Sequence, residues 1–152
     1  MNPSIISYQP EYKANFIALN TAWLEAYFVV EPYDKEVFEN LETYILQPDG
    51  EIFFCLVNEE VAGTVAMQRV NDTTFELTKL AVDPKFQGLK LSHHLMKACI
   101  TFAKSKKATK IMLLSNRKLE TALNLYIKHG FIEVPMKEND YERANIQMEL
   151  SL

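Results

Sequence analysis

The chain has 152 residues with a formal net charge of −4, and 48% of its residues are hydrophobic and 24% charged. This length and composition indicate one globular domain, residues 1–152, with a single substantial core. The acidic balance disfavours broad nucleic-acid binding, and the longest clearly apolar run, residues 52–57, is too short for a membrane span. The first residues do not resemble a secretory signal. We therefore expect a cytoplasmic protein with neither nucleic acid nor membrane as partner.

Hydrophobic periodicity and turn residues predict the secondary structure. In chain order we expect a strand at residues 5–8, helices at 11–28 and 35–44, strands at 52–57, 61–69 and 75–82, a helix at 89–106, a strand at 110–114, a helix at 119–128, and strands at 131–134 and 146–150. This order favours an α/β domain with a mostly antiparallel sheet and one or two parallel crossovers.

The segment of residues 76–95 carries the strongest functional signal. An apolar strand is followed by a turn containing Pro84, and Gly88 then opens an amphipathic helix. Free backbone N–H groups and the positive end of the helix dipole favour a phosphate over such a turn, and glycine permits the close approach of a ligand. Glu76 lies on the strand that leads into this turn, so a candidate base is close to a candidate anion site.

Other residue types exclude several chemistries. The chain has no dinucleotide, Walker or nucleophile-elbow motif, because its glycines are widely spaced at positions 50, 63, 88 and 130. Cys55 and Cys99 stand alone in apolar segments, as buried hydrophobic residues do. His93 and His94 are adjacent on a helix and point about 100° apart, so we expect them at the surface or at a groove rim, and we expect no metal.

Two segments resemble motifs of the GNAT superfamily of acyl-CoA-dependent N-acyltransferases. The residues from Lys85 to Lys90, Lys-Phe-Gln-Gly-Leu-Lys, are similar to the pyrophosphate motif Q/R-x-x-G-x-G/A. The residues from Ala122 to Phe131, Ala-Leu-Asn-Leu-Tyr-Ile-Lys-His-Gly-Phe, are similar to A-x-x-L-Y-x-x-x-G-F. The resemblance implies a GNAT-like fold with a central, mostly antiparallel sheet of about six or seven strands and about four helices.

Three positions depart from these motifs. Lys85 replaces the usual Gln or Arg, and Lys90 replaces the final Gly or Ala. Leu119 stands where the family commonly has an asparagine, with Asn116 and Asn124 nearby. The two lysines keep positive charge beside the phosphates, whereas Leu119 removes one side-chain contact to the cofactor.

The resemblance implies acetyl-CoA as acyl donor. The backbone N–H groups at the start of the helix would hold its pyrophosphate, and the pantetheine arm would pair with Leu80 and Val82, where the N–H of Val82 would also polarise the thioester carbonyl. Asn116 and Asn124 are further candidates for cofactor contact. The candidate pyrophosphate ligands are Gln87, Gly88, Leu89, Lys90, Leu91 and Ser92.

The resemblance also implies the catalytic residues. Glu76 would act as the base, directly or through water, because a lysine-type amine with a pKa near 10.4 is almost fully protonated at pH 7. Since side chains alternate along a strand, we expect Glu76 to share a face with Leu80 and Val82. Tyr126 would protonate the departing thiolate. The alternatives are a solvated edge charge for Glu76 and a packing role for Tyr126.

The resemblance implies that the acceptor is a primary amine of a small molecule or peptide, and the sequence leaves its identity open. Glu31 and Tyr33 near Pro32, and Tyr141 in the last loop, are candidate acceptor contacts. Edge strands near the C-terminus make a homodimer possible. Two alternatives remain open, namely a non-catalytic acyl-CoA-binding sensor or interaction module of the same fold, and a structural domain that binds nothing at Gly88.

Overall fold

The computed structural model describes residues 2–152, so the predicted domain of residues 1–152 is described apart from Met1. Seven strands form one sheet in the order β1-β2-β3-β4-β5-β7-β6. The strands are β1 (Ser4–Ser7), β2 (Glu51–Val57), β3 (Glu60–Arg69), β4 (Thr74–Val82), β5 (Lys110–Ser115), β6 (Ile132–Val134) and β7 (Ile146–Ser151). The helices are α1 (Lys13–Tyr27), α2 (Pro32–Glu39), α3 (Leu91–Ser105) and α4 (Glu120–Lys128), with short turns of 3-10 or π-helix at Pro10–Tyr12, Glu42–Leu46 and Pro84–Phe86.

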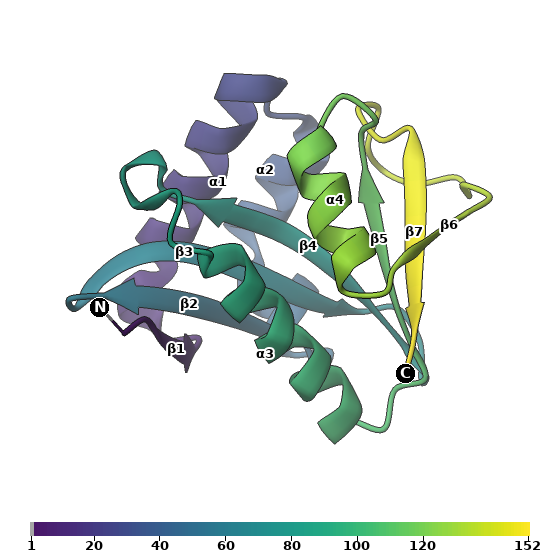
Figure 1. Cartoon of the computed structure of the whole chain (residues 1–152), viewed down its shortest axis with the longest axis horizontal. Coiled ribbons are helices and arrows are strands. Elements are labelled where there is room, and N and C mark those ends of the chain that lie inside the picture. Colours follow the sequence, from purple (N-terminus) through teal and green to yellow (C-terminus); the bar gives the residue numbers. More distant parts are fainter. Residues whose placement is uncertain (1) are drawn as a thin grey trace.

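Helices cover both faces of the sheet (Figure 1). On one face α1 and α2 bury a cluster that includes Phe16, Val37 and Phe54. On the other face α3 and α4 bury a second cluster that includes Leu95 and Tyr126. The predicted α/β fold with a mostly antiparallel sheet is therefore confirmed.

The second helix differs from its prediction. It begins at Pro32 and ends at Glu39, and Asn40 is its C-cap. Proline is favoured in the first turn of a helix because its fixed φ suits that position. Glu31 and Asp34 form a reciprocal capping box around this turn. Pro32 therefore starts the helix, three residues before the predicted start at residue 35.

The strands β4 and β5 are parallel over a short distance only. Their register pairs Thr74–Glu76 with residues 110–112, whereas β5 stays paired with β7 along its whole length. Figure 1 shows β4 and β5 leaving the same corner of the sheet in different directions. Beyond Glu76, β4 pairs with β3 on one side, and its other edge, toward β5, has no partner strand within residues 2–152. We call this unpaired edge of β4 and the gap beside it the opening.

A β-bulge interrupts β4. Ala66 pairs with Thr78 and Thr64 with Ala81, so β4 carries one extra residue. Lys79 takes the positive φ of 59° at this point. The bulge ends the simple alternation of side chains. The expectation that Glu76 shares a face with Leu80 and Val82 is wrong, because these two pack against the α3 side with Phe75 and Leu77, and Glu76 lies on the other face.

Candidate active site

The turn between β4 and α3 has the geometry of an anion site. Gly88 has a φ of 85°, and Lys90, the N-cap of α3, has a φ of 59°. The first N–H groups of a helix have no partner within the helix and carry the positive end of its dipole. The predicted pyrophosphate ligands lie together here and are exposed or half-buried, with the exception of buried Leu91.

Two lysines of the motif have different environments. Lys85 forms an exposed ion pair with Glu60 on β3, and the hydrogen bond to Glu60 raises its pKa. Lys90 is exposed and has a left-handed backbone conformation, at the position where the family motif has glycine or alanine. The departure at Lys90 therefore falls where a side chain strains the backbone.

The β4 edge of the opening presents backbone groups. The N–H of Asp83 donates to the carbonyl of Ala62 on β3 at 2.8 Å. Because successive N–H groups of a strand point in alternate directions, the N–H groups of Val82 and Leu80 point away from β3 and into the opening. Their side chains are half-buried and pack on the core below α3.

The two asparagines differ in availability. The side-chain amide of Asn116 donates to the carbonyl of Arg143 at 2.8 Å, and its oxygen accepts from the N–H of Lys118 at 3.0 Å. Asn116 thus joins the loop after β5 to the loop before β7. Asn124 lies on α4 and is exposed.

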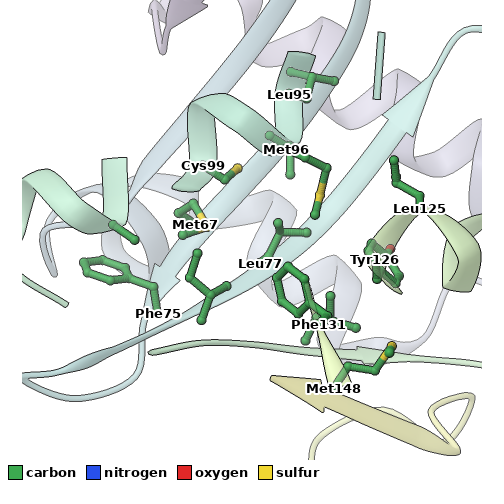
Figure 2. Close-up of a cluster of buried hydrophobic side chains, with 14 of the residues drawn as sticks. Met67, Phe75, Leu77, Leu95, Met96, Cys99, Leu125, Tyr126, Phe131 and Met148 are labelled. Carbon is green, nitrogen blue, oxygen red and sulfur yellow. The ribbon is translucent and has the colours of Figure 1, made fainter. Parts of the chain in front are cut away.

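Tyr126 lies on the inner side of α4, 8% exposed. Figure 2 shows it beside Phe131, in the cluster that also contains Leu77 and Met148, and its ring centroid is 6.0 Å from that of Phe131. Burial raises the pKa of Tyr126 to about 12. The hydroxyl therefore stays protonated at neutral pH and is available as a proton donor.

Glu76 is half-buried at the last register position that joins β4 to β5. Burial raises its pKa to about 7, an effect that Lys79 opposes and Asp140 reinforces. A carboxyl group with this pKa exchanges protons near neutral pH, as a general base must. Glu76 and Tyr126 belong to opposite faces of the sheet, and Glu76 stands where the pairing of β4 with β5 ends.

Lys79 and Asp34 form a buried ion pair on the α2 face. The ammonium Nζ lies 2.5 Å from Oδ1 of Asp34, and the two side chains are 4% and 0% exposed. Arg143 contacts the same carboxylate with both terminal nitrogens, at 2.7 and 2.9 Å. Although burial opposes it, these hydrogen bonds and the charge of Lys79 lower the pKa of Asp34 to about 2. Asp34 is therefore ionised across the physiological range.

Glu31 fastens the loop between β6 and β7 to α2. Its carboxylate oxygens accept from the backbone N–H groups of Glu142 and Arg143, at 2.9 and 3.2 Å. The guanidinium of Arg143 adds a contact of 3.2 Å. These partners occupy the buried carboxylate that the sequence analysis proposed for acceptor binding.

Tyr33 and Tyr141 stand together beside this network. Their ring centroids are 5.2 Å apart in an edge-on arrangement. The hydroxyl of Tyr141 accepts from Lys79 Nζ at 2.9 Å. The Tyr141 ring also lies 4.7 Å from that ammonium and 4.3 Å from the Arg143 guanidinium. Tyr141 is thus engaged with two cations of the protein itself.

Sequence reasoning missed Lys79, Asp34 and Arg143. One signal was available, namely a lysine within the apolar run of β4, between Leu77 and Leu80. Asp34 and Arg143 carried no such mark, because a charged residue in a helix or a loop is ordinary. Their partnership depends on a fold that brings together residues more than 100 positions apart.

Comparisons with known proteins agree with this geometry. A model of the acetyltransferase (GNAT) family matches residues 16–131. The chain belongs to the GNAT acetyltransferase family. An acetyltransferase of this family from Staphylococcus aureus Mu50 has a similar structure, with a TM-score of 0.88, 22% identity and 99% of each chain covered. The PaiA N-acetyltransferase from Thermoplasma acidophilum, in complex with coenzyme A, has a TM-score of 0.77 at 17% identity over all of both chains.

One curated relative is similar in sequence as well. The N-acetylaspartate synthetase of Danio rerio is 31% identical over 102 residues, which are 66% of this chain. The aligned part is 36% of that relative, so the chain matches about a third of its length.

Two kinds of feature are absent from residues 2–152. No helix in this range is long and apolar enough to cross a membrane. The same range contains no group of three or more His, Cys, Asp or Glu side chains placed to hold a metal ion. Cys55 and Cys99 are both free and fully buried, as predicted.

Proposed function

We propose that this protein is a cytoplasmic N-acetyltransferase that transfers an acetyl group from acetyl-CoA to a primary amine by direct attack in a ternary complex. The observation that carries the proposal is the end of the β4–β5 pairing at Glu76, which leaves the β4 edge that leads to the anion site without a partner strand on the side of β5 among the residues that the structure describes. The Thermoplasma acidophilum relative was solved with coenzyme A, which supports this choice of donor.

The donor would be held mainly by backbone groups. The N–H groups of residues 88–92 would bind the pyrophosphate, whereas that of Gln87 already donates to the carbonyl of Pro84 at 3.2 Å. The pantetheine arm would lie along β4 beside Leu80 and Val82. The N–H of Val82, which points into the opening, would polarise the thioester carbonyl, a contact worth about 2–4 kcal/mol in the transition state. Asn124, exposed on α4, remains available to the adenosine end, whereas Asn116 positions the loop.

The chemistry then requires the removal of two protons from the acceptor nitrogen and the protonation of the thiolate. Glu76 accepts the first proton from the acceptor ammonium, directly or through water, and the neutral amine attacks the thioester carbon. A carbon–nitrogen bond forms, the carbon–sulfur bond breaks, and Tyr126 donates its proton to the coenzyme A thiolate. The second proton of the attacking nitrogen then passes through water to Tyr126 and restores its hydroxyl. The buried thiols of Cys55 and Cys99, whose pKa values burial raises, have no role in this scheme.

The acceptor would approach from the α2 side, past Tyr33 and Tyr141. Glu31 holds the neighbouring loop, so we assign it a supporting role at the acceptor site rather than contact with the amine. The aspartate named in the relative's product makes small amino acids the first acceptors to test. A homodimer stays a prediction of the sequence.

A second candidate is a non-catalytic acyl-CoA-binding module. Two observations favour it, namely the strained Lys90 in the phosphate turn and Leu119 at the position of the family asparagine. Both changes concern cofactor binding and leave Glu76 and Tyr126 in place, which favours the enzyme.

The test begins with cofactor binding. Thermal unfolding is measured with acetyl-CoA, coenzyme A and ATP, since a ligand at 100 times its Kd adds about 2.7 kcal/mol to the free energy of unfolding. We expect a higher Tm with both CoA species and no change with ATP. Release of free thiol from acetyl-CoA is then followed with a panel of amino acids, polyamines and peptides. Binding without turnover of any amine would favour the non-catalytic module, and an unchanged Tm would contradict both candidates.

A further inference from the structure

Lys79 combines two energetically unfavourable features, a left-handed backbone and a buried charge. A left-handed backbone is strained for an L-residue, and burying an ammonium group adds a desolvation cost. The φ of Lys79 is 59° and its side chain is 4% exposed. Strain of this kind collects at functional sites, so the bulge requires an explanation beyond packing.

The bulge changes the face to which Lys79 belongs. In a regular strand, residues three apart point to opposite faces, so Glu76 and Lys79 would be separated by the sheet. The extra residue in β4 places the Lys79 ammonium on the α2 face, where it lies 5.5 Å from the ring centroid of Phe38 and 2.5 Å from Oδ1 of Asp34. Glu76 faces this same side, since Phe75 and Leu77 pack on the other.

Several charged or titratable groups surround this pair. From α2 come Asp34, which is fully buried, and Tyr33, and from its N-cap comes Glu31. The loop before β7 supplies Arg143, Tyr141 and Asp140. Arg143 is shared by Asp34 and Glu31, so these three groups leave one negative charge. Lys79 neutralises that charge and is the cation that acts on Glu76.

We propose that Lys79 is a positioning residue, held by Asp34 and Tyr141, whose ammonium favours the carboxylate form of Glu76 and so sets the lower end of the pH range in which the base is active. This inference rests on the proposed function, in which Glu76 is the base. The bulge is then the structural device that delivers a fixed cation to the base. Lys79 itself touches neither substrate nor cofactor in this role.

The test compares pH profiles. In Lys79→Met the acid limb of kcat/KM should move to higher pH by about 0.5–1 unit, because a neighbouring cation favours the charged carboxylate. Lys79→Arg, which keeps the charge, should retain the limb near its original position. Glu31→Gln is the matched control within the same network: it weakens the attachment of the loop without removing a cation, so its limb should not move upward.

A second measurement does not depend on turnover. The side-chain carboxyl of Glu76 is titrated by ¹³C NMR in the wild type and in Lys79→Met, with Glu76→Gln to assign the signal. We expect a higher midpoint in the variant. If the wild type acetylates no amine, the proposed function fails and this titration still decides the role of Lys79. If Lys79→Met has the same Glu76 titration midpoint and the same acid limb of kcat/KM as the wild type, with only a lower Tm, the inference is overturned. If Lys79→Met does not fold, Lys79→Gln, which can still donate to Asp34, replaces it.

Discussion

His93 Nδ1 lies 3.0 Å from His129 Nε2, so the first turn of α3 and the C-cap of α4 share a hydrogen bond between two imidazole rings. One ring must donate and the other accept, which requires at least one neutral histidine. Partial burial, the charge of His93 and the charge of Lys97 lower the pKa of His129. With at least one imidazole neutral, this hydrogen bond joins α3, which begins at the anion site, to α4, which carries Tyr126.

This pair predicts a pH dependence of stability. The folded pKa of His129 is below its unfolded value near 6.5, so the unfolded state binds more protons as the pH falls and stability decreases. The contribution is present above about pH 6.5 and is lost as the pH falls through the folded pKa. We expect His129→Asn to show a smaller loss of unfolding free energy between pH 7.5 and 5.5 in urea titrations. His94→Asn, at an exposed neighbour of His93, should keep the wild-type difference, and an equal change in both variants would contradict the prediction.

The phosphate turn predicts opposite effects at two neighbouring positions. Lys90→Gly should raise the free energy of unfolding by about 1 kcal/mol, because glycine accepts the left-handed conformation without strain. Gly88→Ala should lower it by a similar amount, since a Cβ at Gly88 meets no atom within 4 Å and its cost is conformational alone. Chemical denaturation measures both. If Lys90→Gly instead lowers the free energy of unfolding, the Lys90 side chain stabilises the turn by more than the left-handed backbone destabilises it.

The buried hydroxyl of Tyr126 predicts a selective kinetic defect. Tyr126→Phe should lower kcat by about 100-fold, because general acid catalysis contributes about 10²–10⁴-fold, and it should leave the Kd for acetyl-CoA nearly unchanged. Steady-state kinetics and calorimetric titration give the two quantities separately. Weaker binding with normal turnover would show instead that Tyr126 is a wall of the cofactor site.

The raised pKa of Glu76 predicts a gain in stability on its removal. Its folded pKa of about 7 lies above its unfolded value, so the folded state binds more protons and stability is lost as the pH rises through 7. Glu76→Gln should therefore stabilise the protein at pH 8 by about 1 kcal/mol and by less at pH 5, while lowering kcat/KM. Urea titrations at the two pH values test this. An equal gain in unfolding free energy at pH 8 and pH 5 would show that the ionisation of Glu76 is not the cause of the gain.

Local sequence signals predicted most of the fold. The turn at Asn58 and Glu59, both with positive φ, is a short connection that lets apolar strands pair antiparallel. The turn at Gly88 followed from the strand-to-helix pattern, and Tyr126 from the resemblance of residues 122–131 to the GNAT motif A-x-x-L-Y-x-x-x-G-F. In each case the information lies within a few residues along the chain, where periodicity and turn chemistry act.

The parts that could not be predicted depend on contacts between distant segments. The bulge at Lys79 is stabilised by Asp34 and Tyr141, which lie 45 and 62 positions away. The engagement of Glu31 depends on a loop more than 100 positions away. His129 likewise meets His93 only through the packing of two helices. Periodicity contains no information on such pairs, because each partner alone has an ordinary local sequence.

The short pairing of β4 with β5 divides the sheet into two consecutive parts of the chain. Strands β1 to β4 come from residues 4–82, and β5, β7 and β6 from residues 110–151, with α3 as the connection between them. Three register pairs join the two parts directly. A ligand seated in the opening touches both parts, so its binding energy resists their separation, and amide hydrogen exchange along β4 and β5 should slow together when the opening is filled.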